Sequence, residues 1–174
     1  MQRVLMLHSS REGQTVKILR FMEQELGEGF KCELVNLHDD PKVELSQYDK
    51  VIVGASIRYG HLNTKLYSFI QENQKALTES DNAFFCVNLT ARKPGKDIPE
   101  NSAYIKKFLA KSPWQPKKIA VFAGALFYPR YRLFDRVMIR FIMKITGGET
   151  DTSKEVEYTD WEKVRTFCDI LRAR

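Results

Sequence analysis

The sequence predicts an α/β fold, a doubly wound, five-stranded parallel sheet with helices on both faces. Apolar segments of strand length alternate with segments of helical period along the chain, as in proteins that alternate strands and crossover helices. Residues 50–54 form an apolar run of the kind found in strands that a parallel sheet buries on both faces. A length of 174 residues and a hydrophobic content of 43% fit a single domain, residues 1–174.

Five segments are expected to form the strands. They are short apolar runs bounded by polar or glycine-containing loops, at residues 4–7, 32–37, 50–54, 83–88 and 119–126. In doubly wound sheets, ligands bind outside the carboxyl ends of the strands. The polar loops that follow the first, third and fourth strands are therefore candidate binding loops, at residues 9–15, 55–61 and 88–93.

Helices are expected between the strands and at the end of the chain. Residues 16–26 place their apolar side chains on one face, and Gly27 and Gly29 follow as termination signals. Asn63 is a candidate N-cap for the next helix, and another helix is expected around residues 102–111. Thr159 and Glu162 have the spacing of a capping box that opens a final helix.

Composition narrows the functional classes. The net charge of +6 and a pI near 9.2 favour an anionic partner. We expect neither a secretory signal nor a membrane span, because no apolar run approaches about 20 residues. The histidines lack metal-ligand spacing, so no metal site is expected. An odd number of cysteines in apolar surroundings indicates buried free thiols in a reducing cytosol, at Cys32, Cys86 and Cys168.

Several catalytic fingerprints are absent. The chain has no G-x-x-x-x-G-K-[ST] motif, and Gly13 is the lone glycine of the first loop, which excludes G-x-G-x-x-G there. Arg58 stands where a nucleophile elbow around Ser56 would need glycine. Gly54 stands where a receiver domain would need aspartate, and the first loop lacks the cysteine of a low-molecular-weight phosphatase.

The first candidate loop suits a phosphate group. It reads His-Ser-Ser-Arg-Glu-Gly-Gln-Thr over residues 8–15 and leads into a helix. Free backbone N–H groups and the helix dipole favour an anion at such an N-terminus. Ser9, Ser10 and Thr15 add hydroxyl donors, and Arg11 adds a cation. The same residue types are equally common in an ordinary N-cap and turn, so this loop alone leaves both interpretations open.

The other two loops carry groups that could frame a flat ring. Gly54 and Gly60 permit backbone geometries that other residues resist, and Tyr59 could stack on an aromatic ligand. Residues 88–93 offer an amide, a hydroxyl and two cations, although a solvated basic loop is the alternative. Three such loops at one edge of a sheet favour a phosphorylated aromatic cofactor more strongly than any one of the loops does alone.

An insertion, residues 128–150, follows the expected fifth strand. Within it, residues 131–145 are expected to form a helix that ends at Gly147 and Gly148. Residues 130–144 contain five cations against Asp135, which is +4 of the chain's +6. Most remaining positions of this segment are apolar, including Phe134 and Phe141. Cations recur every four residues and so share one side of the helix, at Arg132, Arg136, Arg140 and Lys144.

A basic helix with so much apolar surface is typical of the membrane interface, where cations meet anionic headgroups. Nucleic acid is disfavoured as a partner, because it would require the basic face without exposed Phe, Ile and Met. A core helix whose arginines extend to solvent is an alternative. A lid over a hydrophobic substrate is a further role, compatible with membrane contact.

These motifs together resemble a known family. The first loop, Ser-Ser-Arg-Glu-Gly-Gln-Thr, resembles the FMN phosphate loop of the flavodoxin superfamily. Residues 48–61, 87–94, 124–132, 147–152 and 158–161 are similar to motifs of the bacterial quinone-dependent protoporphyrinogen IX dehydrogenases, which are flavodoxin-like enzymes of haem biosynthesis. The likeness covers nearly the whole chain and includes the insertion. It implies a flavodoxin-like fold with a long insertion in the strand-five region.

The resemblance implies that FMN is the cofactor and that the flavin, not a side chain, supplies the catalytic chemistry. It places the FMN phosphate at the first loop and the isoalloxazine between the other two. The implied cofactor-binding residues are Ser9, Ser10, Arg11, Glu12, Gly13, Gln14, Thr15, Ser56, Ile57, Arg58, Tyr59, Gly60, Asn88, Leu89, Thr90, Ala91 and Arg92.

The resemblance also implies oxidation of protoporphyrinogen IX to protoporphyrin IX, with electrons passed to a membrane quinone, menaquinone or ubiquinone. Arg58, Arg92 and Lys93 are candidate partners of the substrate's propionates. The implied location is the cytoplasm, at the inner face of the cell membrane. Another flavodoxin-type NAD(P)H:quinone reductase and a non-enzymatic electron-transfer flavodoxin or membrane-binding module are the alternatives.

Overall fold

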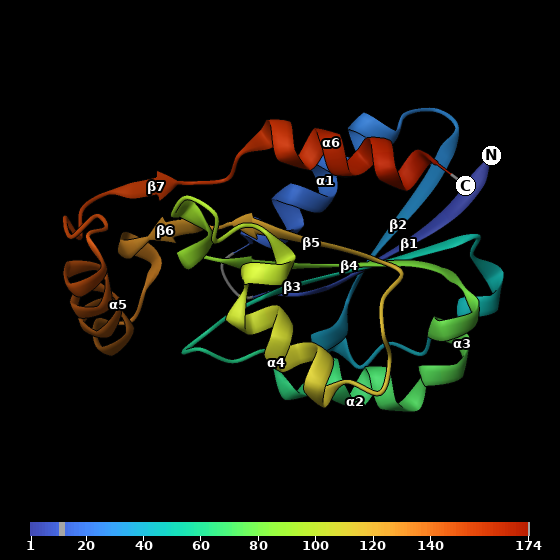
Figure 1. Ribbon diagram of the computed structural model, residues 1–174, viewed down its shortest axis with the longest axis horizontal. Helices are drawn as coiled ribbons and strands as arrows, with labels where there is room; N and C mark the ends of the chain where they lie inside the picture. The colour runs from blue at the N-terminus through green and yellow to red at the C-terminus, as the bar shows by residue number, and fades with distance from the viewer. Residues whose placement is uncertain (11–12, 174) are drawn as a thin grey trace.

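A five-stranded parallel sheet in the order β2-β1-β3-β4-β5 forms the centre of the molecule (Figure 1). The structure is a computed structural model that describes residues 1–10 and 13–173. The expected doubly wound α/β class is confirmed, and each expected strand is present. The strands are β1 Gln2–Ser9, β2 Phe30–Asn36, β3 Lys50–Ser56, β4 Asp81–Asn88 and β5 Lys118–Ala123.

Helices cover both faces of the sheet. In Figure 1, α1 and α6 lie on one face, and α2, α3 and α4 lie on the other. α5 lies beyond the carboxyl ends of the strands, at the opposite end of the molecule from both termini. The helices are α1 Gln14–Leu26, α2 Thr64–Glu72, α3 Gln74–Glu79, α4 Ala103–Lys111, α5 Leu133–Thr146 and α6 Trp161–Arg172. Of these, α3 is not expected from the sequence.

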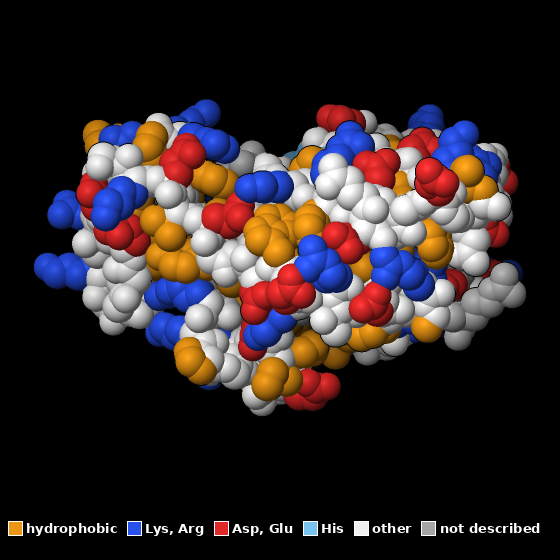
Figure 2. Space-filling view, turned by 90° about the horizontal axis from the view of Figure 1, so that it is seen from above, with side chains coloured by type: hydrophobic (Ala, Val, Ile, Leu, Met, Phe, Trp, Pro, Cys, Tyr) orange, Lys and Arg blue, Asp and Glu red, His pale blue; other side chains and the backbone are white. Residues whose placement is uncertain are grey.

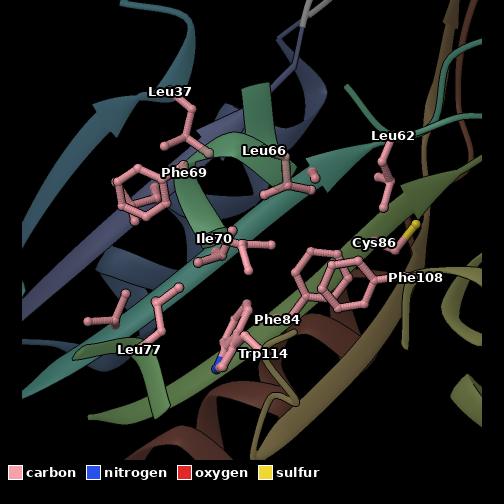
Figure 3. Packing of buried hydrophobic residues seen from close by; sticks show 14 of the residues in the cluster. Leu37, Leu62, Leu66, Phe69, Ile70, Leu77, Phe84, Cys86, Phe108 and Trp114 are labelled. Carbon is pink, nitrogen blue, oxygen red and sulfur yellow. The ribbon is translucent and has the colours of Figure 1, made fainter. Parts of the chain in front are cut away.

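The core on the α2–α4 side is rich in aromatic rings (Figure 3). Phe84 of β4 stacks on Phe108 of α4 with ring centroids 4.2 Å apart, and Trp114 meets both rings edge-on. All three side chains are fully buried. A second core, between the sheet and α1 and α6, includes Phe85, Phe122 and Phe167. Burial of these faces holds the helices against the sheet.

Three charged residues meet at the amino end of the sheet. Lys50 and Lys118, at the starts of β3 and β5, both contact the carboxylate of Asp81, at the start of β4. The Lys50 side chain is only 3% exposed, so its ammonium depends on this partner. Burial alone would raise the pKa of Asp81, but the hydrogen bonds from the two lysines outweigh it and hold that pKa below its usual value.

Some helix ends follow the sequence signals and one does not. Gly27, with φ of 76°, ends α1, and the Asn63 side chain accepts from Lys65 N at 2.9 Å as expected. The expected capping box at Thr159 is wrong, because Asp160 caps α6 by accepting from the backbone N–H groups of its first turn. The Thr159 hydroxyl instead donates to the carbonyl of Ala123 at 2.6 Å. A tertiary contact therefore decides which residue caps this helix.

The fifth strand ends earlier than expected. β5 stops at Ala123, and after Gly124 the chain enters β6 Ala125–Phe127, which pairs antiparallel with β7 Glu155–Glu157 in a separate two-stranded sheet. Gly124 donates to Asn88 O and accepts from Tyr158 N, so the chain leaves the main sheet between these two partners. A Cβ on Gly124 would lie 3.1 Å from the Val87 side chain, which explains the glycine at this close approach.

The insertion contains the expected helix, α5, which ends at Gly147 with φ of 75°. Met143 of α5 packs with Leu126 and Tyr128 in a small third core at this end of the molecule. Within the described residues, no helix is long and apolar enough to cross a membrane.

Candidate functional site

Two neighbouring hollows open where the sheet's carboxyl ends face α5. The inner hollow, about 230 Å³, is lined by the loops after β1, β3 and β4 and by the inward side of α5. The outer hollow, about 600 Å³, lies between the β3 loop, the start of α5 and the segment around His38. The sequence-predicted loops therefore meet at one site, as expected. Ser10, Gln14, Ser56, Ile57, Arg58, Tyr59, Gly60, Asn88, Leu89, Thr90, Arg92 and Lys93 line the inner hollow.

The N-terminus of α1 presents unused hydrogen-bonding groups. Gly13 precedes the helix with φ of 90°, and its position offers no side-chain cap. The Thr15 hydroxyl is fully buried and has no partner among the described residues. Uncapped N–H groups and an unpaired buried hydroxyl fit a phosphate group at this helix end. Arg11 and Glu12, also expected here, lie outside the described residues.

Ser9 and Gln14 have structural partners at this end of the sheet. The Ser9 hydroxyl lies 2.9 Å from His38 Nε2. The Gln14 amide donates to Thr159 Oγ1 at 2.9 Å and to Glu157 at 3.2 Å, which ties α1 to the β7–α6 segment. Burial alone would raise the pKa of Glu157, but hydrogen bonds from Lys17, Trp161 and Gln14 outweigh it and keep that pKa below its usual value.

The β3 loop turns back sharply beside the inner hollow. Arg58 and His61 exchange two backbone hydrogen bonds of 2.9 and 3.0 Å. The two residues between them, Tyr59 and Gly60, have φ of 49° and 75°, as in a type I′ turn. Positive φ is costly for tyrosine, and the turn leaves its ring 46% exposed at the rim of both hollows. The Arg58 guanidinium lies over this ring, 5.3 Å from its centroid.

Gly54 serves packing, not an unusual turn. A Cβ at this position would run into the ring of Phe85 from β4. The expected freedom of backbone geometry therefore applies to Gly60, with its positive φ, and not to Gly54.

The β4 loop is stabilised by its own side chains. Asn88 Oδ1 accepts from Ala91 N at 2.9 Å, and both residues are buried. Arg92 donates to Leu89 O at 2.7 Å and reaches α5, where it donates to the hydroxyl and carbonyl of Thr146 at 3.0 and 3.2 Å. Arg92 therefore fixes the end of α5 as well as lining the hollow.

The start of α5 is held by a second arginine. Arg58 Nη2 lies 2.6 Å from Asp135 Oδ2, and the side chains are 31% and 15% exposed. Two of the three cations expected to bind substrate carboxylates, Arg58 and Arg92, thus contact α5 in this structure. Lys93, the third, lines the inner hollow.

The outward side of α5 is apolar and exposed. Six hydrophobic side chains of α5 are between 45% and 74% exposed: Leu133, Phe134, Val137, Phe141, Ile142 and Ile145. Of these, Ile142 also lines the inner hollow and Phe134 the outer one. Figure 2 shows Lys and Arg side chains projecting from the end of the molecule that carries α5, with hydrophobic side chains among them. Arg132, Arg140 and Lys144 are exposed, but Arg136 is half-buried and donates to Tyr128 O and Tyr131 O. One of the four expected surface cations therefore anchors the helix.

Several residues of the site were not expected from the sequence. Tyr131, Asp135, Ile139, Met143 and Thr146 bring the inward side of the insertion to the inner hollow. One signal was available, because Asp135 is the single acid among the cations of residues 130–144. An acid in so basic a segment suggests a specific cationic partner.

The three cysteines are free thiols, and Cys86 and Cys168 are buried as expected, whereas Cys32 is only partly buried. Burial raises the pKa of Cys86 and of Cys168 to about 12 and that of Cys32 to about 11, so none of them is a nucleophile at neutral pH. No cluster of metal-ligating side chains occurs in the described part of the chain.

Comparison with known proteins identifies the family. A family model described as a flavodoxin domain matches residues 5–153. A protein of Escherichia coli strain K12 named protoporphyrinogen IX dehydrogenase [quinone] is 48% identical over 167 residues, which are 95% of this chain and 92% of that protein. The chain belongs to this dehydrogenase family. A family member from Leishmania major with the same name is 46% identical over 171 residues, 97% of this chain and 74% of its own.

Solved structures support the fold assignment. The two-electron reduced flavodoxin of Megasphaera elsdenii matches with a TM-score of 0.51 at 13% identity, over 68% of this chain and 84% of its own. An FMN complex of a Lactobacillus acidophilus flavoprotein matches with a TM-score of 0.50 at 15% identity, over 70% of this chain and 93% of its own. The expected flavodoxin-like fold and family resemblance are confirmed.

Proposed function

We propose that this chain is an FMN-dependent dehydrogenase that oxidises protoporphyrinogen IX to protoporphyrin IX and passes the electrons to a membrane quinone. The observation that carries the proposal is the 48% identity over nearly the full length of a named family member, insertion included. The relatives from Escherichia coli and Leishmania major are both named as dehydrogenases, which does not favour either alternative, an NAD(P)H:quinone reductase or a non-enzymatic electron carrier. We further propose that residues 1–174 form one domain.

The site fits FMN at both of its ends. At the phosphate end, α1 begins without a side-chain cap, and the buried hydroxyl of Thr15 has no partner within the described residues. At the ring end, the inner hollow lies between the β3 and β4 loops, with the Tyr59 ring at its rim. We assign the phosphate to residues 9–15 and the ring to residues 56–60 and 88–92.

Bound FMN would supply two-electron redox chemistry, so the oxidation of the porphyrinogen would take three rounds, each of which removes two electrons and two protons from the substrate and converts one quinone to its quinol. The protein's part is to bind and orient. The inward side chains of α5, including Ile139 and Met143, supply an apolar wall that excludes water from the ring end of the site. We assign no side chain as a catalytic acid or base.

We also propose that α5 lies in the headgroup region of the cytoplasmic leaflet of an anionic membrane. Six apolar side chains of α5 are exposed, four of which line neither hollow, and Arg132, Arg140 and Lys144 are exposed beside them. Burying those apolar side chains among acyl chains is favourable, and the cations add attraction to anionic headgroups. Because the inward side of the same helix lines the inner hollow, a lipid-soluble quinone would reach the site from the membrane side.

An anaerobic turnover assay tests the activity. FMN-loaded protein mixed with protoporphyrinogen IX and a menaquinone analogue is expected to produce porphyrin fluorescence, and omission of either FMN or quinone is expected to abolish it. NADPH in place of the porphyrinogen is expected to give no comparable quinone reduction. Rapid quinone reduction by NADPH with no porphyrin formed would instead favour the reductase alternative.

Vesicle flotation tests the membrane role. The double variant Phe141→Ser/Ile145→Ser removes two exposed apolar side chains of α5 that line neither hollow. We expect binding to vesicles of mixed phosphatidylglycerol and phosphatidylcholine to weaken about tenfold or more. The matched control is Ile98→Ser/Ile170→Ser, which removes two apolar side chains exposed elsewhere on the molecule. Equal flotation of the two double variants would contradict the proposal.

A further inference from the structure

The inner and outer hollows share an ion pair in their lining. Arg58 and Asp135 line both hollows, as do Ser10, Ser56 and Tyr59. The Arg58–Asp135 contact of 2.6 Å joins the β3 loop to the start of α5, and so it forms part of the wall between the two spaces. Parting these two side chains would merge the hollows.

This inference rests on the proposed function, because the inner hollow is too small for the flavin and the substrate unless such an opening occurs. The inner hollow of about 230 Å³ is smaller than the roughly 300–1,000 Å³ of ordinary small-molecule sites. It cannot hold a three-ring flavin and a four-ring tetrapyrrole together. The adjoining outer hollow of about 600 Å³ supplies the missing space.

Charge indicates which end of the substrate enters the outer hollow. Among the described residues, its lining carries two arginines, Arg58 and Arg132, and one acid, Asp135. Arg132 makes no ion pair within the described residues. The two propionates of protoporphyrinogen IX sit on neighbouring pyrroles, so they need two cations on the same side of the site. Arg92 is less suitable, because it is held by Leu89 O and Thr146 and does not line the outer hollow.

We propose that the outer hollow is the carboxylate end of the substrate site, where Arg58 and Arg132 bind the two propionates of the tetrapyrrole. In the absence of substrate, Arg58 forms an ion pair with Asp135. When substrate binds, a propionate replaces the Asp135 carboxylate as a partner of Arg58. One carboxylate exchanges for another, so Arg58 stays paired throughout. The exchange also frees the start of α5 to move away from the β3 loop. Substrate entry and movement of α5 are thereby coupled.

Equilibrium binding of the stable product tests this proposal without turnover. The probes are protoporphyrin IX and its dimethyl ester, which has the same rings but no carboxylates, titrated by fluorescence into FMN-loaded protein. Arg132→Gln is expected to weaken diacid binding about tenfold or more and to leave diester binding unchanged. Asp135→Asn is expected to tighten diacid binding about fivefold more than diester binding, because it removes a competitor for Arg58 that only a carboxylate of the substrate replaces.

Two control variants separate this effect from a general change of charge. Glu155→Gln breaks the exposed Arg130–Glu155 ion pair in the same end of the molecule and lines neither hollow. Arg20→Gln removes a distant exposed arginine of α1. Both are expected to leave the diacid and diester affinities unchanged. A gain of affinity in Asp135→Asn cannot result from a damaged fold, which makes that variant the decisive one.

The outcomes distinguish this proposal from the proposed function. Diacid binding by Asp135→Asn that does not tighten relative to diester binding would overturn the exchange, even if the wild-type protein oxidises protoporphyrinogen. Equal weakening of diacid and diester by Arg132→Gln would overturn the role of Arg132. Absence of porphyrinogen oxidation, with the expected binding pattern intact, would overturn the proposed function and leave the binding site standing.

Discussion

The two ends of the sheet are built differently. At the amino end, Asp81 forms ion pairs with two lysines. In the nearby core, the side chains of Phe84, Phe108 and Trp114 are fully buried. At the carboxyl end, the buried Thr15 hydroxyl lacks a partner within the described residues, and α5 exposes a row of apolar side chains. The Trp114 indole N–H also lacks a partner within the described residues, but the second end alone combines an unpaired hydroxyl with a row of exposed apolar side chains.

This difference indicates where stability and function reside in the chain. Unpaired buried polar groups and exposed apolar surface both cost stability, so a protein retains them where a ligand or surface supplies the missing contacts. Substitutions at the amino end should therefore change the free energy of unfolding. Substitutions of the Thr15 hydroxyl or of the exposed apolar side chains of α5 should change binding with little effect on the unliganded fold.

The largest expected difference is between the effects of two phenylalanine substitutions on the free energy of unfolding. Phe108→Ala removes a fully buried ring stacked on Phe84 and is expected to lower the free energy of unfolding by about 3–5 kcal/mol. Phe141→Ala removes a ring that is 60% exposed and is expected to change it by less than about 0.5 kcal/mol. Urea denaturation of the two variants in the absence of lipid gives both values. Comparable losses would show that α5 packs against the body more tightly than its exposure indicates.

Thr15→Val tests the ligand end. The substitution keeps the shape of the side chain and removes the buried hydroxyl, so FMN affinity is expected to fall about tenfold to a hundredfold, as for loss of a hydrogen bond to a charged group. The unliganded protein is expected to be as stable as the wild type or more so, because an unpaired polar atom has gone. Fluorescence titration with FMN and thermal melts of the unliganded protein measure the two effects. Loss of stability without loss of FMN affinity would place the hydroxyl in the fold instead.

Asp81→Asn tests the amino end through its pH dependence. At pH 7 we expect a loss of about 1–2 kcal/mol, which allows for screening of a carboxylate that is 36% exposed. The pKa of Asp81 is lowered in the folded state, so its contribution is complete above the unfolded-state pKa and disappears as pH falls through the folded-state pKa. Urea midpoints of wild type and variant should therefore converge at acid pH. Asp169→Asn, which breaks an exposed i,i+3 pair of α6, is the control with little expected change.

The main sheet and its helices could be predicted because short-range patterns encode them. Apolar runs mark all five strands, and single residues such as Asn63 and Gly27 mark helix ends. The pair of β6 and β7 could not be predicted, because each strand has three residues and its partner lies far along the chain. The choice of Asp160 over Thr159 as a cap likewise depends on a distant carbonyl, that of Ala123.

The three loops of the candidate site could be predicted from the sequence, but their contacts with α5 could not. The three loops share a position after the strands, and sheet topology alone brings them together. The Arg58–Asp135 contact joins residues 77 positions apart, and no spacing rule predicts it. For the same reason, Arg58 and Arg92 were identified as available cations, although in the structure both contact α5. Residue type indicated what these side chains can bind, but only the fold showed what they touch.

The most direct test of the central claim is a single-turnover experiment in which FMN-loaded protein is mixed anaerobically with protoporphyrinogen IX without quinone. We expect the flavin absorbance to bleach at a rate that depends on the porphyrinogen concentration, and later addition of quinone to restore it. A flavin that stays oxidised in the presence of porphyrinogen, while it is reduced by NADPH, would contradict the assignment.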